Sequence, residues 1–194
     1  MTPVTSLFSV PIWKDTLPNF SNLKETFINA VMEFEADNPT GDHKSNQWGY
    51  QSPKDLHKLP ELAPLFSYVT RMAYNAADSI KLRKNFAIME SWVNINRSRQ
   101  CMNHQHTHGG VFSGIFYLKV PEGSGQLFLV NPAINSMWQG ISLIETPTQY
   151  TSESIFVNPK EGSIIIWPSY LPHAVGTNNH DAERISIAFN LYIG

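Results

Sequence analysis

Three histidines stand at every second position in the segment "NHQHTHGG", residues 103–110. His104, His106 and His108 would share one face of an extended chain, because side chains two apart on a β-strand point to the same side. Two such imidazoles can bind one metal ion, and neutral imidazoles suit divalent iron, zinc, copper or nickel. The spacing alone allows either His104/His106 or His106/His108 as the pair.

A third candidate ligand is His173, in "WPSYLPHAVGTN". It follows the apolar run "SIIIW" and two prolines, Pro168 and Pro172, that would stiffen its backbone. A histidine taken alone is more often a surface residue than a ligand. The combination of the spaced pair with a distal histidine favours a metal site, and three protein ligands would leave positions open for substrate or oxygen.

Arg184 and Ser186, in "ERIS", also lie two residues apart and would share a face of a strand. An arginine with a hydroxyl beside it suits a carboxylate, which a guanidinium can bind through two charge-assisted hydrogen bonds. If the arginine is buried it needs an anionic partner, because an unpaired buried charge is costly. A dicarboxylate cosubstrate would meet that need.

The fold that positions these residues can be inferred first from the composition of the chain, which is that of an ordinary globular protein. The chain has 194 residues, with 42% hydrophobic and 15% charged, which predicts one globular domain with a proper core. A net charge of -2 argues against a nucleic-acid-binding surface. The single cysteine, Cys101, suits a reducing compartment. The start, "MTPVTSLFSVPIW", does not look like a signal peptide and no segment is long enough to span a membrane, so we expect a cytoplasmic location.

The pattern of apolar residues changes near residue 85. Before it, after an extended start, helical spacing predicts helices over 21–37 and 60–82, with Ser21 as N-cap of the first. After it, short β-rich runs are separated by turn signals, and we expect strands within 86–98, 110–120, 125–131, 152–158, 162–169 and 184–193. The class is therefore α+β: one domain, with a helical support region over 1–85 and an antiparallel barrel or sandwich over 86–194.

The order "HTH…SGIFYL…PHAV…RIS" resembles the 2-oxoglutarate/Fe(II)-dependent oxygenases, especially their prolyl-4-hydroxylase-like branch. Within it the chain is similar to a group of small oxygenases found in phages and marine bacteria, which share "LFSVPIW", "SNQWGYQS" and "WVNIN". In a phage protein the expected location would be the host cytoplasm. The resemblance implies a double-stranded β-helix, or jelly roll, with packed N-terminal helices.

The resemblance also implies roles for residues. His106, His108 and His173 would hold Fe(II), and Arg184 and Ser186 would hold the far carboxylate of 2-oxoglutarate. Two further residues match the pattern: Tyr117 as a cosubstrate contact, and Asn103 as a feature of the smaller group. On this register His104 would be a surface residue or a neighbour of the ligands.

One position departs from the family pattern. The second ligand is normally a carboxylate, whereas position 108 is histidine, which leaves an Fe(II) site one unit more positive. The implied activity is a dioxygenase that hydroxylates an unknown substrate, with peptidyl proline as the analogy from the nearest branch and ascorbate as a candidate additional cofactor. Two alternatives stay open: a cupin-type metalloenzyme that does not use 2-oxoglutarate, and a non-catalytic jelly-roll binding or structural protein.

Residues around the candidate site are interpreted more simply. Trp167, just before the distal turn, is expected to line the substrate cavity, and the long irregular segment over 131–154 is expected to act as a lid that shapes specificity. His43, His57 and His180 have no partner pattern, and we expect them to be solvated.

Overall fold

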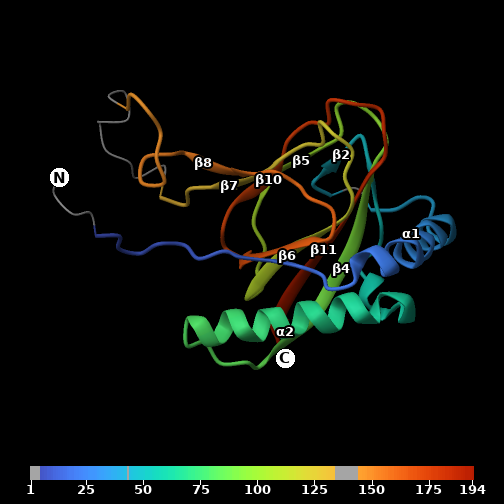
Figure 1. The fold of residues 1–194 in the computed structure, drawn as a ribbon, viewed down its shortest axis with the longest axis horizontal. Coiled ribbons are helices and arrows are strands. Elements are labelled where there is room, and N and C mark those ends of the chain that lie inside the picture. The colour runs from blue at the N-terminus through green and yellow to red at the C-terminus, as the bar shows by residue number, and fades with distance from the viewer. Residues whose placement is uncertain (1–4, 43, 134–143) are drawn as a thin grey trace.

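The fold is a jelly roll of two facing antiparallel sheets, with two helices outside. The structure is a computed structural model, and it describes residues 5–42, 44–133 and 144–194. Helix α1 (Phe20–Asp37) and helix α2 (Ala63–Ser79) both lie against the sheet that contains β6, β11 and β4 (Figure 1). The predicted double-stranded β-helix with packed N-terminal helices is confirmed.

The larger sheet has six strands in the order β1-β9-β6-β11-β4-β3. Its strands are β1 (Trp13–Thr16), β9 (Ser163–Pro168), β6 (Phe112–Lys119), β11 (Arg184–Ile193), β4 (Phe86–Asn96) and β3 (Tyr50–Gln51). The smaller sheet has five strands in the order β2-β5-β10-β7-β8. Its strands are β2 (Asn46–Gln47), β5 (Met102–His106), β10 (His173–Val175), β7 (Leu127–Val130) and β8 (Ser154–Val157).

The central strands of the larger sheet are buried on both faces. On β6, Phe116 packs toward the helices, whereas its neighbours Ile115 and Tyr117 belong to the cluster between the two sheets. This explains why "FSGIFYL" is apolar throughout instead of alternating with polar residues. Alternation also fixes the inward face of each strand: Trp167 on β9 and Ser186 on β11 point into the roll with Tyr117.

Most predicted elements are present, with three differences. The first helix begins at Phe20, with Asn19 as N-cap in place of Ser21. The second helix is preceded by two short 3-10 turns, so that α2 proper covers only the middle of the predicted span. The strands β5 and β10, which carry His106 and His173, were not among the predicted runs, because β5 is short and mostly polar and β10 has only three residues.

The first 85 residues also supply strands. β1 pairs with β9 in the larger sheet, and the short segment over 46–51 joins both sheets, since β2 pairs with β5 and β3 pairs with β4. The division at residue 85 into a helical support region and a jelly-roll core stays a prediction. The region before residue 85 also contributes β1, β2 and β3 to the two sheets. Within the described part of the chain, neither helix is long and apolar enough to cross a membrane.

Candidate metal centre

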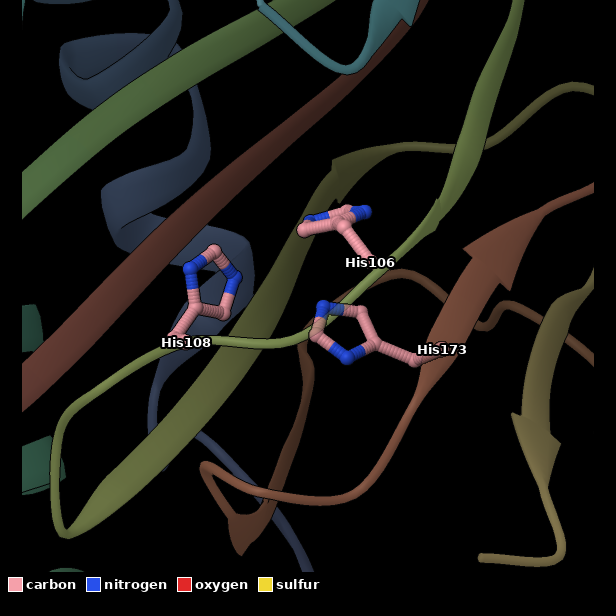
Figure 2. Close-up of side chains that lie close together, drawn as sticks. All are labelled: His106, His108 and His173. Atoms are coloured by element: carbon pink, nitrogen blue, oxygen red, sulfur yellow. The ribbon is translucent and has the colours of Figure 1, made fainter.

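Three histidine side chains converge at one end of the roll. One ring nitrogen of each of His106, His108 and His173 can be chosen so that all three atoms lie within 4.8 Å of one another. His106 ends β5 and His173 begins β10, where the two residues are paired in register. Figure 2 shows the three rings turned toward one another, with His108 on the loop that follows β5. The three imidazoles are thus close enough together that one metal ion could bind all of them after a small adjustment.

The face predicted for His104, His106 and His108 is found only in part, since His106 and His108 both reach the cluster and His104 does not. β5 ends at His106, the β5–β10 register shifts between Asn103 and His106, and His108 lies beyond the strand. His104 is exposed and is not part of the cluster. Of the two pairs that the sequence left open, the structure thus brings His106 and His108 together with the distal histidine.

The rings of His106 and His173 are oriented by the backbone in the same way. His106 Nδ1 lies 2.6 Å from the carbonyl oxygen of His104, and His173 Nδ1 lies 3.0 Å from that of Leu171. Because a carbonyl can only accept, each Nδ1 must carry the proton. This tautomer leaves Nε2 as the unprotonated nitrogen, and an N–H bound to a carbonyl is the usual support of a metal-binding imidazole.

Burial keeps all three imidazoles neutral at physiological pH. The pKa of His173 is lowered to about 3, mainly by burial and less by His106 and His108, against an opposing effect of its bond to the Leu171 carbonyl; the pKa of His108 is lowered to about 4, mainly by burial and less by His106. The pKa of His106 is lowered too, mainly by burial, against a smaller opposing effect of its bond to the His104 carbonyl. Neutral imidazole is the form that binds a metal, so no proton has to be displaced near pH 7.

The loop that carries His108 is tied to its surroundings by backbone hydrogen bonds. His108 N donates to Ser169 O at 3.0 Å, and Val111 N donates to Leu191 O at 2.7 Å. Gly110 sits so close to β11 that a Cβ there would lie 2.6 Å from Leu191 O. The close approach requires glycine at this position.

Arg184 is a fully buried cation without an anionic partner. Its Nη1 donates to Ser186 Oγ at 3.1 Å, whereas Nε and Nη2 find no acceptor among the residues that the structure describes. The Tyr117 ring centre lies 5.5 Å from Arg184 Cζ, and the buried Tyr117 hydroxyl also has no partner in that part of the chain. Burial lowers the pKa of Arg184, while the neighbouring Tyr117 raises it.

A cavity joins the histidines to the strand end that carries Ser186. Its lining comes from both sheets and includes Asn94, Asn103, Ser113, Trp167, Ser186 and Asn190, together with the three histidines and Trp92. The Trp167 ring lies 4.9 Å from His173, and the Trp92 ring 5.9 Å from His108. Trp167 therefore lines the cavity as predicted, and Asn103 lies at it.

Sequence reasoning missed Trp92, Asn94, Ser113 and Asn190 as cavity residues. The signal was present, because Ser113 lies four residues before Tyr117 and Asn190 four residues after Ser186, so each pair shares one face of its strand. Trp92 and Asn94 share a face of β4, which pairs with β11 at Ala188 and Ser186.

Two of the histidines that were expected to be solvated, His57 and His180, are partly buried. His57 is not simply solvated: it is half-buried, and its Nδ1 lies 3.0 Å from the buried Ser91 hydroxyl. His180 is also partly buried and contacts Ser124 through Nε2 at 3.3 Å. His43 lies outside the described residues, as do residues 134–143 of the segment expected to form a lid, and the role of that segment stays a prediction.

Comparison with known proteins gives two results at the level of sequence. A family model described as "Putative 2OG-Fe(II) oxygenase" matches residues 90–190, a span that begins in β4 and ends in β11. A search of curated proteins gives no significant match.

Solved structures with the same fold are distant in sequence. The epimerase SnoN of nogalamycin biosynthesis, which is non-haem and α-ketoglutarate-dependent, aligns with a TM-score of 0.68 and 11% identity over 94% of this chain and 76% of that one. A Pseudomonas putida prolyl-4-hydroxylase aligns with a TM-score of 0.63 and 12% identity over 96% and 94% of the two chains. HygX of Streptomyces hygroscopicus, solved with nickel, 2-oxoglutarate and hygromycin B, aligns with a TM-score of 0.63 and 10% identity over 94% and 83%. Each shares the fold.

Proposed function

The chain belongs to the 2OG-Fe(II) oxygenase family, and from that premise we propose that His106, His108 and His173 hold Fe(II) while Arg184 holds 2-oxoglutarate. The reaction class converts 2-oxoglutarate, oxygen and a C–H bond of the substrate into succinate, carbon dioxide and a C–OH group. One oxygen atom enters succinate and the other enters the product.

The main support for this proposal is that the buried guanidinium of Arg184 has no anionic partner among the residues that the structure describes. A buried guanidinium with two unpartnered nitrogens is expensive, and proteins retain such a group when a ligand completes it. The missing partner must be an anion small enough to reach the interior of the roll. A carboxylate fits, because it accepts two parallel hydrogen bonds from a guanidinium and further ones from the hydroxyls of Ser186 and Tyr117.

The donor set at the other end of the cavity fits a divalent metal. His106 and His173 have Nε2 free, and all three rings are neutral, converging and half-buried or buried. His108 in place of the family's carboxylate makes the ligand set neutral, and imidazole remains a good ligand for iron, nickel and zinc. When bound, Fe(II) supplies the oxygen chemistry of the reaction.

The chain's own residues bind, orient and exclude water. Arg184, Ser186 and Tyr117 would fix the far carboxylate, so that the keto acid end of 2-oxoglutarate is directed along the cavity toward the histidines. Trp92 and Trp167 cover His108 and His173 with apolar rings, which keeps bulk water from the reacting atoms. Both indoles are almost fully buried, at 5% and 3% exposure.

An Arg184→Met variant tests the cosubstrate site. It replaces the buried charge by an apolar chain of similar length, so we expect 2-oxoglutarate binding, titrated anaerobically with Co(II) present, to weaken at least a hundredfold. The metal-free protein should unfold at the same temperature or higher, because an unpaired buried charge has been removed. Arg99→Met is the control, since Arg99 is exposed and paired with Asp181 at the surface. Equal binding by both variants would contradict the proposal.

Turnover is tested by succinate formation from 2-oxoglutarate with Fe(II), oxygen and ascorbate, over a panel of substrates that includes proline-containing peptides. Peptidyl proline is the first substrate class to test, by analogy with the prolyl hydroxylases that share the fold. Oxygen uptake that is independent of 2-oxoglutarate and survives Arg184→Met would instead favour a cupin-type enzyme. Metal binding that raises the melting temperature without any oxygen uptake would favour a structural protein.

A further inference from the structure

Two chains of contacts connect His108 to Glu90. One chain runs through buried hydrogen bonds to the backbone of the His108 loop, and the other runs through aromatic and cation contacts to the His108 ring. Both start from the same carboxylate on β4. The consequence for metal binding rests on the proposed function.

The first chain is made of hydrogen bonds between polar side chains inside the roll. Asn190 Nδ2 donates to Glu90 Oε2 at 3.2 Å, and Ser113 Oγ donates to Asn190 Oδ1 at 2.7 Å. Ser113 Oγ and Ser169 Oγ are hydrogen-bonded at 2.9 Å. The carbonyl of Ser169 then accepts from His108 N at 3.0 Å. The three linking residues are 0–1% exposed, so no water competes for these bonds.

The second chain reaches the ring of the same histidine. Lys54 Nζ donates to Glu90 Oε1 at 2.6 Å and lies 5.7 Å from the centre of the Trp92 ring. The Trp92 ring also contacts the ring of His108, and the two ring centres lie 5.9 Å apart. Glu90 also accepts from the Tyr192 hydroxyl at 3.2 Å, so its carboxylate is held by three donors.

We propose that Glu90, Asn190 and Ser113 are positioning residues that hold His108 in place as a metal ligand. His108 needs such support because it lies on a loop beyond β5, whereas His106 and His173 are fixed by strand pairing and by carbonyls two residues earlier. No hydrogen bond to the His108 ring occurs among the described residues. Its orientation therefore comes from the backbone bond and from ring packing, with His106 at 4.8 Å and His173 at 5.1 Å on the ligand side and Trp92 at 5.9 Å.

The test uses anaerobic Co(II) titration, followed by visible absorption, which reports affinity and the number of ligands. Ser113→Ala removes the link in the middle of the first chain, and we expect Co(II) to bind about tenfold more weakly with an altered spectrum. Ser52→Ala is the matched control. Ser52 is equally buried, with hydrogen bonds to Val93 N at 3.0 Å and Pro53 O at 2.8 Å, and it lies outside both chains of contacts.

A second pair of variants covers the case in which Ser113→Ala does not fold. Glu90→Gln removes the charge at which both chains meet while keeping the shape of the side chain, which is 25% exposed, and we expect several-fold weaker Co(II) binding. Glu161→Gln is its control, because Glu161 has a similar exposure and pairs with Lys24 at 2.7 Å without being part of either chain.

The outcomes separate this inference from the proposed function. If the wild-type protein binds no Co(II), the proposed function fails. If it binds Co(II) and His108→Ala weakens binding, the function stands. Should Ser113→Ala and Glu90→Gln then keep the wild-type affinity and spectrum, as their controls are expected to do, the positioning role is overturned.

Discussion

The guanidinium carbon of Arg184 lies 5.5 Å from the centre of the Tyr117 ring, and both side chains are fully buried. Burial raises the pKa of Tyr117 to about 12, against a smaller lowering by Arg184, so its hydroxyl stays protonated near pH 7. The pair therefore holds hydrogen-bond donors that have no acceptor among the described residues, next to Ser186 of the cavity lining. Only an acceptor, and best an anion, completes this arrangement.

Tyr117→Phe removes one of these donors and little else. We expect 2-oxoglutarate to bind about tenfold more weakly, since a hydrogen bond to a charged group is worth roughly 1.5–3 kcal/mol and part of it can be replaced. The ligand-free protein should be as stable as the wild type or more so, because an unpartnered buried hydroxyl is lost. Isothermal titration and thermal unfolding measure the two effects. Tyr68→Phe, which loses an exposed bond to Asp15, should leave cosubstrate binding unchanged.

The charge and the number of the metal ligands depend on His108. We expect His108→Ala to weaken Co(II) or Fe(II) binding by tenfold or more, and His108→Asp to keep metal binding, since it restores the carboxylate usual in the family. Anaerobic metal titration measures both. The control is His104→Ala: the His104 side chain is exposed, and the carbonyl that accepts from His106 remains after the substitution. A loss of affinity in His104→Ala equal to that in His108→Ala would show that the wrong histidine has been assigned.

Gly110→Ala tests the packing of the His108 loop against β11. The new Cβ would lie 2.6 Å from Leu191 O and 3.1 Å from Ser169 Oγ, so the loop must shift. We expect a loss of about 1–3 kcal/mol in the free energy of unfolding, typical of overpacking, together with weaker metal binding. Gly109→Ala serves as the neighbour control, since a Cβ there meets nothing within 4 Å. Similar losses in both variants would mean that the contact of residue 110 with β11 is not their cause, because restricting the unfolded chain by Gly→Ala is stabilising on its own.

The pH dependence of the metal-free protein follows from the buried imidazoles. Burial lowers the pKa of His173 to about 3 and of His108 to about 4, whereas an unfolded histidine titrates near 6.5. Between these values the unfolded chain binds more protons than the folded one. Stability is therefore greatest above pH 6.5 and falls as the pH drops from there toward 3, by up to about 1.4 kcal/mol per pH unit for each histidine.

Urea unfolding in the presence of a chelator, between pH 8 and pH 4.5, measures this slope. His173→Gln should flatten it by about one histidine's contribution relative to the wild type. An unchanged slope in that variant would mean that His173 is protonated in the folded protein.

Much of the fold follows from the sequence because long strands and helices carry strong patterns. The run over 184–193 is rich in β-branched and aromatic residues, and it forms β11 with the bounds expected. The strands that hold two of the candidate ligands were harder to foresee. β10 has only three residues, His173–Val175, and it is a strand because it is paired on both sides, with β5 and β7. Such pairing is a tertiary effect that local propensity does not contain.

The candidate site was likewise predictable only in part from the sequence. Spacing was enough to propose Arg184 and Ser186, whose side chains share a face of β11 and are hydrogen-bonded. For the histidines, spacing left two pairs open: His106 and His108 converge, whereas His104 is exposed and stays outside the cluster, on the stretch where the β5–β10 register shifts. What brings His108 to the cluster is a backbone bond to Ser169, a residue distant in sequence.

The carbonyls of residues 104 and 171 orient two of the three imidazoles, and every amino acid has a carbonyl. The direction of His106 and His173 is thus independent of which side chains stand at those two positions. Position 104 is exposed, so relatives of this protein can vary there and keep the same ligand geometry, whereas Leu171 is buried and is constrained by its packing in the core. Sequence variability next to a ligand is no sign here that the ligand's support has been lost.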